Sequence, residues 1–282
     1  MTEYAFIVAA SENYLPGLKA MFNSLEVLGN EQDVVLLSYK LPSDFLGSLS
    51  TYSFDVEVIE SIGDHQIHAT AIERFRIAVD VGQDRKAVCL LDADMFFVSN
   101  VDLFFQIASK GFIVTGSNGM MINFDKKYQD KFEVDLGQRS YLYLKTHTSV
   151  PIFISKLDLD WFDALYHSRR YDYWDDFLYL NILGIKMSKD KKMLCMPPYA
   201  FTGIHHWHLK PVIHVICKGG HLVSGTEQPI YMVHGKWWDQ GWYDDLEKVM
   251  RRYCEENEQC FKIALHSRQI LKEEFEKRRN MK

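Results

Sequence analysis

The sequence predicts an α/β protein with a mainly parallel, doubly wound sheet flanked by helices. Short apolar runs of strand character alternate with segments whose apolar residues recur at helical spacing. The chain is also large enough for a substantial core, since its 282 residues are 47% hydrophobic. Alternating strands and helices of this kind build a parallel sheet covered on both faces.

The first half of the chain supplies these elements in order. Residues 4–10 form an apolar, strand-like run, and the next helix has apolar residues at helical spacing up to Gly29, a typical stop. Further strands are predicted over 34–39, 56–59, 88–92, 112–115 and 120–124, with helices over 69–81 and 103–108. A turn at Gly116–Gly119 separates the last two of these strands.

The second half carries a different pattern. Helices are predicted from Asp158 and over 175–184, and residues 197–241 are rich in aromatic, His, Gly and Pro residues with short strands over 212–216 and 230–233. The tail is charged and has helical periodicity. We therefore predict a main domain over residues 1–241 and a C-terminal helical extension over 242–282 packed on it.

Composition excludes several classes of protein. A formal net charge of −6 gives no overall basic field for nucleic acid or an anionic membrane. The sequence shows no signal peptide and no transmembrane segment, so a cytoplasmic protein is expected. Its 5 cysteines lack paired spacing, which argues against a disulfide framework or a zinc site, and the role of His205–His208 stays open.

The most informative motif is Asp92-Ala-Asp94, which ends an apolar run of strand character. Carboxylates at the carboxyl end of a buried strand lie at the crevice where open sheets bind ligands. Two carboxylates and a diphosphate together suit Mn²⁺ or Mg²⁺. The motif therefore indicates a metal-diphosphate site, and the alternative is an aspartate that caps the next helix.

Three motifs together resemble the nucleotide-binding half of the glycogenin-like (family 8) retaining glycosyltransferases, which have the GT-A fold. They are Ala5-Phe-Ile-Val-Ala-Ala-Ser-Glu-Asn-Tyr14, Arg74-Phe-Arg76 and Leu91-Asp-Ala-Asp94. In this family the first strand and the following turn bind uracil, a basic residue one helix before the acidic motif contacts the donor, and the two aspartates hold Mn²⁺. The resemblance assigns these roles, in that order, to Ala9, Ala10, Asn13, Tyr14, Arg76, Asp92 and Asp94.

The remaining site residues follow from two shorter similarities. Tyr231-Met-Val-His234-Gly235-Lys236-Trp237 is similar to the family's C-terminal motif, although it is shorter and has Trp in place of Pro. It implies His234 as a third metal ligand, and Gly235 and Lys236 as donor contacts, with Lys236 also assisting catalysis. Asp176-Phe-Leu-Tyr-Leu-Asn181 matches a family pattern beside the reacting sugar carbon, which makes Asp176 the catalytic candidate and Asp175 its reserve.

The resemblance implies a metal-dependent transfer of sugar from a nucleotide sugar, UDP-linked, to an acceptor hydroxyl with retention, by a GT-A catalytic domain over 1–241. The acceptor stays open among a glycan, a lipid-linked saccharide, a protein and a modified nucleic acid. Alternatives are a haloacid-dehalogenase-type phosphatase using Asp92 and Asp94, a sugar nucleotidyltransferase, and a non-catalytic interaction protein. The phosphatase is the second hypothesis. The strand that carries the nucleophile of such phosphatases normally opens the domain, whereas here a long α/β segment precedes Asp92.

Overall fold

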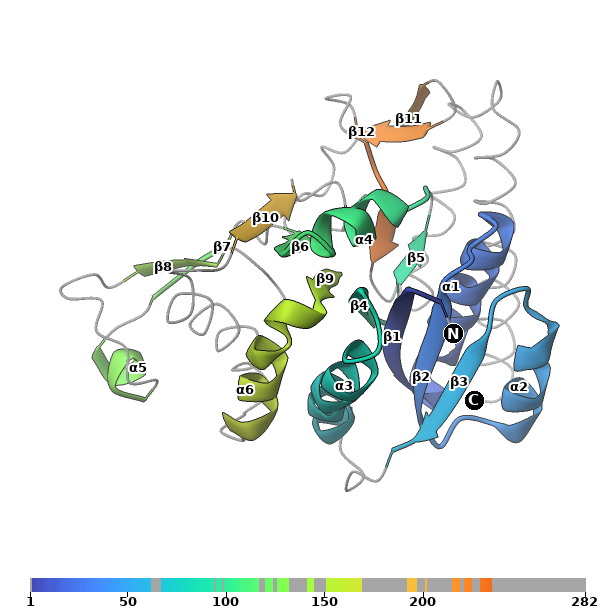
Figure 1. Cartoon of the computed structure of the whole chain (residues 1–282), viewed down its shortest axis with the longest axis horizontal. Coiled ribbons are helices and arrows are strands. Elements are labelled where there is room, and N and C mark those ends of the chain that lie inside the picture. Colours follow the sequence, from blue (N-terminus) through green and yellow to red (C-terminus); the bar gives the residue numbers. More distant parts are fainter. Residues whose placement is uncertain are drawn as a thin grey trace, which may run out of the picture.

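A computed structural model of the chain describes residues 2–61, 67–93, 95–97, 99–116, 120–123, 126–131, 141–144, 151–168, 192–196, 201, 215–218, 221–224 and 229–234. Its centre is a seven-stranded sheet between helices (Figure 1). In spatial order the strands are β10 (Lys192–Met196), β6 (Phe112–Gly116), β9 (Ile152–Ser155), β4 (Ala87–Asp92), β1 (Tyr4–Ser11), β2 (Asp33–Tyr39) and β3 (Val56–Glu60).

Only β9 runs against its neighbours in this sheet. It pairs antiparallel with β4 and β6, whereas the β10–β6, β4–β1, β1–β2 and β2–β3 pairs are all parallel. The central strands are apolar almost throughout, as strands buried on both faces must be. The predicted mainly parallel α/β fold is therefore confirmed.

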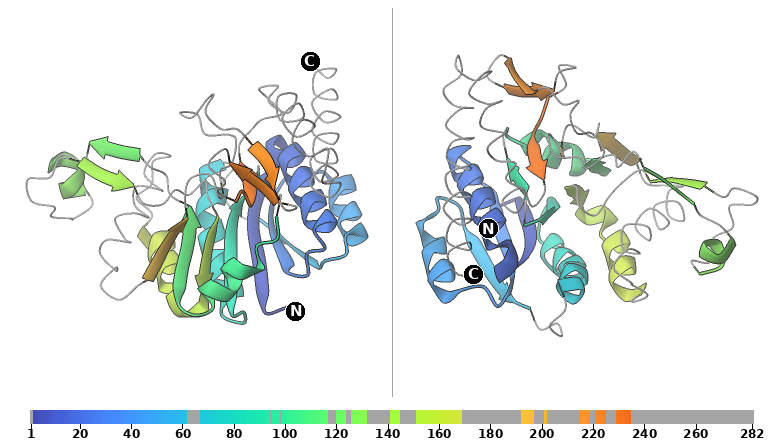
Figure 2. Two further views of the ribbon diagram at one scale, coloured as in Figure 1. Left: turned by 90° about the horizontal axis from the view of Figure 1, so that it is seen from above. Right: turned by 180° about the vertical axis from the view of Figure 1, so that it is seen from behind.

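Helices cover both faces of the sheet (Figure 2). One face packs against α1 (Leu15–Val27), α2 (Ser43–Ser48) and α4 (Asp102–Ala108), and the other against α3 (Ile67–Gly82) and α6 (Asp160–Ser168). Short 3-10 turns lie at η1 (Glu12–Tyr14), η2 (Leu49–Thr51) and η3 (Lys156–Asp158). Successive strand residues point to opposite faces, which assigns every strand residue to one of these two layers.

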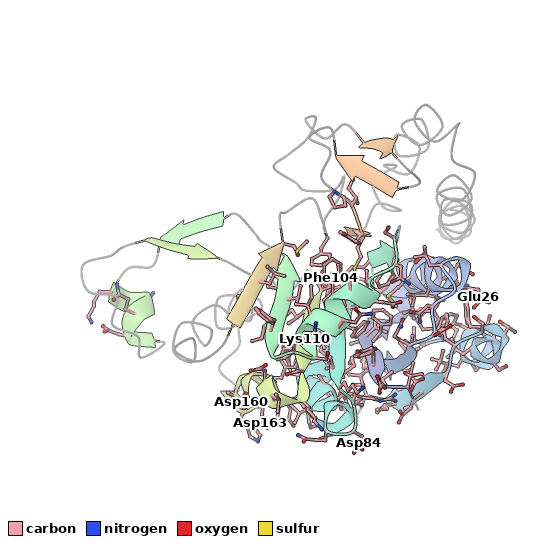
Figure 3. All side chains as sticks on the ribbon, turned by 45° about the horizontal axis from the view of Figure 1, so that its top comes forward. Glu26, Asp84, Phe104, Lys110, Asp160 and Asp163 are labelled. Atoms are coloured by element: carbon pink, nitrogen blue, oxygen red, sulfur yellow. The ribbon has the colours of Figure 1, made fainter. Side chains whose placement is uncertain are left out.

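Aromatic side chains fill the layer between α4 and the sheet. Phe104 and Phe105 lie on α4, with ring centroids 5.4 Å and 5.0 Å from that of Phe153 on β9. Figure 3 shows Phe104 within this packing, whereas Asp84, Asp160 and Asp163 lie at the periphery. Each buried aromatic ring contributes about 2–3 kcal/mol of hydrophobic free energy, so this layer is a major source of stability.

Three small strand pairs lie outside the main sheet. They are β7 (Met120–Asn123) with β8 (Tyr141–Leu144), β11 (Val215–Lys218) with β12 (His221–Ser224), and β5 (Met95–Phe97) with β13 (Met232–His234). One short helix, α5 (Lys126–Lys131), follows β7. The strands on either side of Gly116–Gly119 do not pair with each other, because β9 and β10 occupy both edges of β6. The strand predicted over 212–216 is found at β11.

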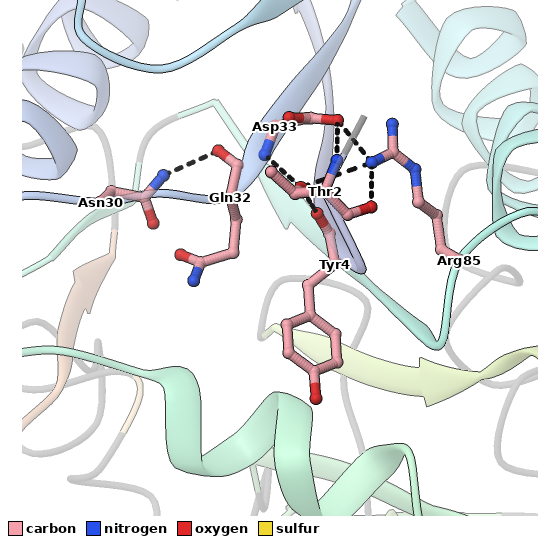
Figure 4. A network of polar contacts seen from close by, with 6 residues as sticks. All are labelled: Thr2, Tyr4, Asn30, Gln32, Asp33 and Arg85. Atoms are coloured by element: carbon pink, nitrogen blue, oxygen red, sulfur yellow. Dashed lines mark hydrogen bonds and ion pairs between the residues drawn. The ribbon is translucent and has the colours of Figure 1, made fainter.

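An ion-pair network closes the amino-terminal edge of the sheet (Figure 4). The Arg85 guanidinium pairs with the Asp33 carboxylate and donates to the Thr2 carbonyl, and the Thr2 N–H donates to Asp33 Oδ2 at 3.0 Å. Burial by itself raises the pKa of Asp33, but the hydrogen bond from Thr2 and the Arg85 guanidinium outweigh it and lower that pKa below its usual value. The network therefore holds the starts of β1, β2 and β4 together.

The predicted extension over 242–282, and its boundary at residue 241, lie outside the described residues. Within the described part of the chain, every helix is too short or too polar to cross a bilayer.

Candidate functional site

The order of the strands reverses between β1 and β4, and the carboxyl ends of these two strands lie at the reversal. The chain forms β1, β2 and β3 towards one edge of the sheet and then returns to the other side of β1 with β4. Open α/β sheets bind ligands outside the carboxyl ends of the strands at such a reversal. Ala9 is in register with Asp92 at this point, so two of the predicted site residues lie side by side.

Asp92 is the last residue of β4 and lies on the α3 face of the sheet. The strand residues before it are buried, whereas the Asp92 side chain is 23% exposed. The Arg74 guanidinium on α3 pairs with Asp92 Oδ1 and also donates to the Leu91 carbonyl at 3.4 Å. A charge-assisted hydrogen bond of this kind restricts the orientation of the carboxylate.

Arg76 has a different position from Arg74, although both lie on α3. Its guanidinium pairs with Glu73 at 3.3 Å and with Asp80 at 2.8 Å, both on the same helix, and its side chain is 34% exposed. Arg74 is only 5% exposed. The structure therefore brings Arg74, and not Arg76, to the acidic motif.

Sequence spacing contains a signal for this difference. Ile77 and Ala78 lie three and four residues after Arg74 and are buried, so Arg74 shares their helix face. Arg76 instead has acidic residues three positions before and four positions after it, the spacing of ion pairs along a helix. Arg74 is thus a site residue that motif matching alone did not single out.

The predicted base-binding residues lie at the end of β1 and in η1. Ala9 packs on the α3 face with Asp92, whereas Ala10 is 3% exposed and packs on the opposite, α1 face. Asn13 is exposed, and Tyr14 is half-buried against the α1 layer. Of these residues, Ala9 and the exposed Asn13 have positions that suit direct contact with a ligand at the carboxyl end of β1.

A second strand pair brings the C-terminal part of the chain to the acidic motif. β5 begins at Met95, directly after Asp94, and pairs antiparallel with β13. In this ladder His234 is opposite Met95. Backbone pairing therefore sets His234 opposite the residue that directly follows the Asp92-Ala-Asp94 motif, although the two segments are far apart in sequence.

The structure describes only some of the other predicted site residues. Asp94, Asp175, Asp176, Gly235 and Lys236 lie outside the described residues, and His234 is described in its backbone. Among the described side chains no group of three His, Cys, Asp or Glu residues is arranged to hold a metal. Asp92 is the only proposed ligand whose side chain is described.

The proposed donor set nevertheless fits a divalent ion chemically. Two carboxylates and a neutral imidazole are ligands that Mn²⁺ accepts, and three protein ligands leave positions for phosphate oxygens. The register of β5 and β13 sets the backbone of His234 opposite Met95, the residue that follows the acidic motif in the chain, and Asp92 ends β4. Such an ion would supply Lewis-acid stabilisation of negative charge.

Comparison with known proteins gives structural neighbours only. No protein-family model and no curated protein matches the sequence. The bifunctional glycosyltransferase WbbM, in its apo form, superposes with a TM-score of 0.53 at 12% identity, covering 88% of this chain and 50% of WbbM. The likeness to WbbM shows a shared fold.

Two further glycosyltransferases match less of the chain. GlyE of Streptococcus pneumoniae TIGR4 gives a TM-score of 0.46 at 16% identity over 69% of this chain and 45% of GlyE. The galactosyltransferase LgtC, solved with donor and acceptor sugar analogs, gives 0.43 at 15% identity over 62% of this chain and 69% of LgtC. The chain spans about half the length of WbbM and GlyE.

Proposed function

We propose that this protein is a metal-dependent glycosyltransferase that transfers sugar from a UDP-sugar to an acceptor hydroxyl. One observation carries the proposal: the β5–β13 ladder sets His234 opposite Met95, beside the acidic motif at the switch point of the sheet. This is where a nucleotide diphosphate and its metal ion would bind in an open α/β sheet. The fold shared with the glycosyltransferase WbbM supports the proposal.

In this proposal each residue has a defined role. Asp92, Asp94 and His234 would hold Mn²⁺ or Mg²⁺, and an ion held there would supply stabilisation of negative charge on the leaving diphosphate. Arg74 fixes the orientation of the Asp92 carboxylate through the ion pair between them. Lys236 adds a positive charge beside the leaving group, and Gly235 allows the backbone to approach the phosphates.

The proposal also names the residues that contact the base and the sugar of the donor. The uracil lies at the end of β1, against Ala9 and the η1 turn with Asn13 and Tyr14, while Ala10 supports the strand from the other face. Asp176, with Asp175 as its alternative, stabilises the oxocarbenium-like carbon or positions the acceptor hydroxyl. Retention of anomeric configuration is the expected stereochemistry.

Substitutions of Arg74 and Arg76 test whether these two arginines of α3 have different roles. Arg74→Met is expected to lower kcat/KM for the donor by about 10–100-fold, because Asp92 loses the group that orients it. Arg76→Met removes only partly exposed ion pairs along the helix and should change kcat/KM by less than about threefold. Initial rates of UDP release for both variants test this, and equal losses would contradict the role given to Arg74.

A panel of nucleotide sugars tests the function itself. Each donor is incubated with the full chain in the presence and absence of Mn²⁺, and both nucleotide release and thermal stabilisation are measured. Metal-dependent release of UDP from one donor supports the proposal and identifies the sugar. Hydrolysis of a simple phosphomonoester with no response to any nucleotide sugar would instead favour the phosphatase.

A further inference from the structure

A buried serine joins helix α1 to the strand that follows the acidic motif. Ser24 lies near the end of α1 and is 1% exposed. Its hydroxyl donates to the Met21 carbonyl at 2.7 Å and accepts the Phe97 N–H of β5 at 2.9 Å. Because the hydroxyl proton is committed to α1, the oxygen is oriented to accept from β5.

The position of Ser24 has a local cost. Met21 and Leu25 beside it are buried and apolar, and a serine that donates back to its own helix is a poor helix former. An alanine would suit the helix better. The serine therefore makes sense through its second hydrogen bond, which satisfies the N–H of the fully buried Phe97.

β5 depends on this bond because it is short. It has three residues, and in the described part of the chain its only strand partner is β13. Apolar contact with α1 orients it only loosely, since hydrophobic packing is not directional. The bond from Ser24 fixes the position of β5 along α1.

We infer that Ser24 is a positioning residue for the metal site. Met95, the first residue of β5, follows Asp94 in the chain and pairs with His234, so a shift of β5 displaces the residue that links the two segments. Ser24 acts through this ladder and does not touch the metal or the donor. The inference rests on the proposed function, because it requires Asp94 and His234 to share a divalent ion.

The test measures Mn²⁺ affinity in the presence of UDP, from the free-Mn²⁺ electron paramagnetic resonance signal, on the full chain. Ser24→Ala is expected to weaken Mn²⁺ binding about tenfold, as loss of outer-shell support does at other metal sites. Ser24→Cys places a slightly larger atom that is a weaker acceptor at the same position, and it should give a smaller loss in the same direction. It replaces Ser24→Ala if that variant does not fold.

Ser155→Ala is the matched control. Ser155 is also 1% exposed and its hydroxyl also accepts a backbone N–H, from Leu157 at 3.2 Å, but it pairs with Ala87 at the opposite end of β4. Its loss should leave Mn²⁺ affinity within twofold of the wild type, by the rule that distant sites act independently.

Three results would contradict these proposals, and they distinguish the role of Ser24 from the proposed function. Wild-type affinity in the Ser24 variants refutes the role of Ser24 and leaves the proposed function standing. An equal loss of Mn²⁺ affinity in the Ser24 and Ser155 variants would be an effect of general stability, and it would also refute the role of Ser24. Absence of UDP-dependent Mn²⁺ binding in the wild type refutes the proposed function.

Discussion

Asp94→Ala is expected to abolish metal-dependent binding of the donor and to lower kcat/KM by about 10³-fold. The divalent ion would lose one of its two carboxylates, and Lewis-acid stabilisation of the leaving diphosphate is worth several kcal/mol, where each factor of ten in rate corresponds to about 1.4 kcal/mol. Thermal stabilisation by UDP and Mn²⁺ together, measured beside initial rates, separates lost binding from lost chemistry.

Asp80→Asn is the control for removal of an acidic side chain. Asp80 pairs with Arg76 on α3 and its side chain is 58% exposed, so its charge contributes little to binding or stability. Rates close to wild type are expected. If Asp94→Ala kept metal-dependent stabilisation by UDP, the acidic motif would not be the metal site.

Arg85→Met is expected to lower the free energy of unfolding by about 3–5 kcal/mol. It leaves the Asp33 carboxylate, which is 6% exposed, buried without the guanidinium that compensates its charge. Urea unfolding at pH 7 measures the loss. Because the network lies at the amino-terminal edge of the sheet, activity per folded molecule should not change.

The pH dependence of this loss has a definite sign. In the wild type the pKa of Asp33 is lowered, so its contribution to stability is present above the ordinary carboxyl pKa and is lost as pH falls through the folded value. In Arg85→Met the lowering by the guanidinium is lost while the hydrogen bonds from Thr2 remain, so the pKa of Asp33 rises above its wild-type folded value. The difference in stability between the two proteins should therefore be constant near neutral pH and shrink as the pH falls through the folded-state pKa of Asp33 in the variant.

A double variant separates the buried charge from lost packing. Asp33→Leu combined with Arg85→Met removes both charges and should recover most of the stability lost by Arg85→Met alone. If the double variant were as unstable as the sum of the two single variants, the ion pair would not explain the role of Arg85.

The core of the fold could be predicted because its signals are local. The strands over 4–11, 33–39 and 87–92 are built on continuous apolar runs, the strand over 56–60 has β-branched residues between its two glutamates, and the helices between the strands have clear helical spacing. Their alternation determines a parallel arrangement and also locates the crevice beside Asp92. The parallel strands β1 to β4 and the place of the acidic motif therefore followed from the sequence, whereas β9 and β10 were not predicted.

The features that were missed depend on distant contacts. The pairing of β5 with β13 has no local pattern, since each strand has only three residues, and the separation of β6 from β7 depends on β9 and β10 occupying the edges of β6. Arg74 could have been found from helical spacing, because it shares a face with buried residues. Ser24 could not, because its partner is a backbone N–H on another element.

The most direct test is a crystal structure with UDP and Mn²⁺, with the ion located by anomalous scattering at the manganese edge. We predict one anomalous peak at the carboxyl end of β4, coordinated by Asp92, Asp94, His234 and the diphosphate, with Arg74 still paired to Asp92. UDP bound elsewhere, or a manganese peak without His234 among its ligands, would contradict the account.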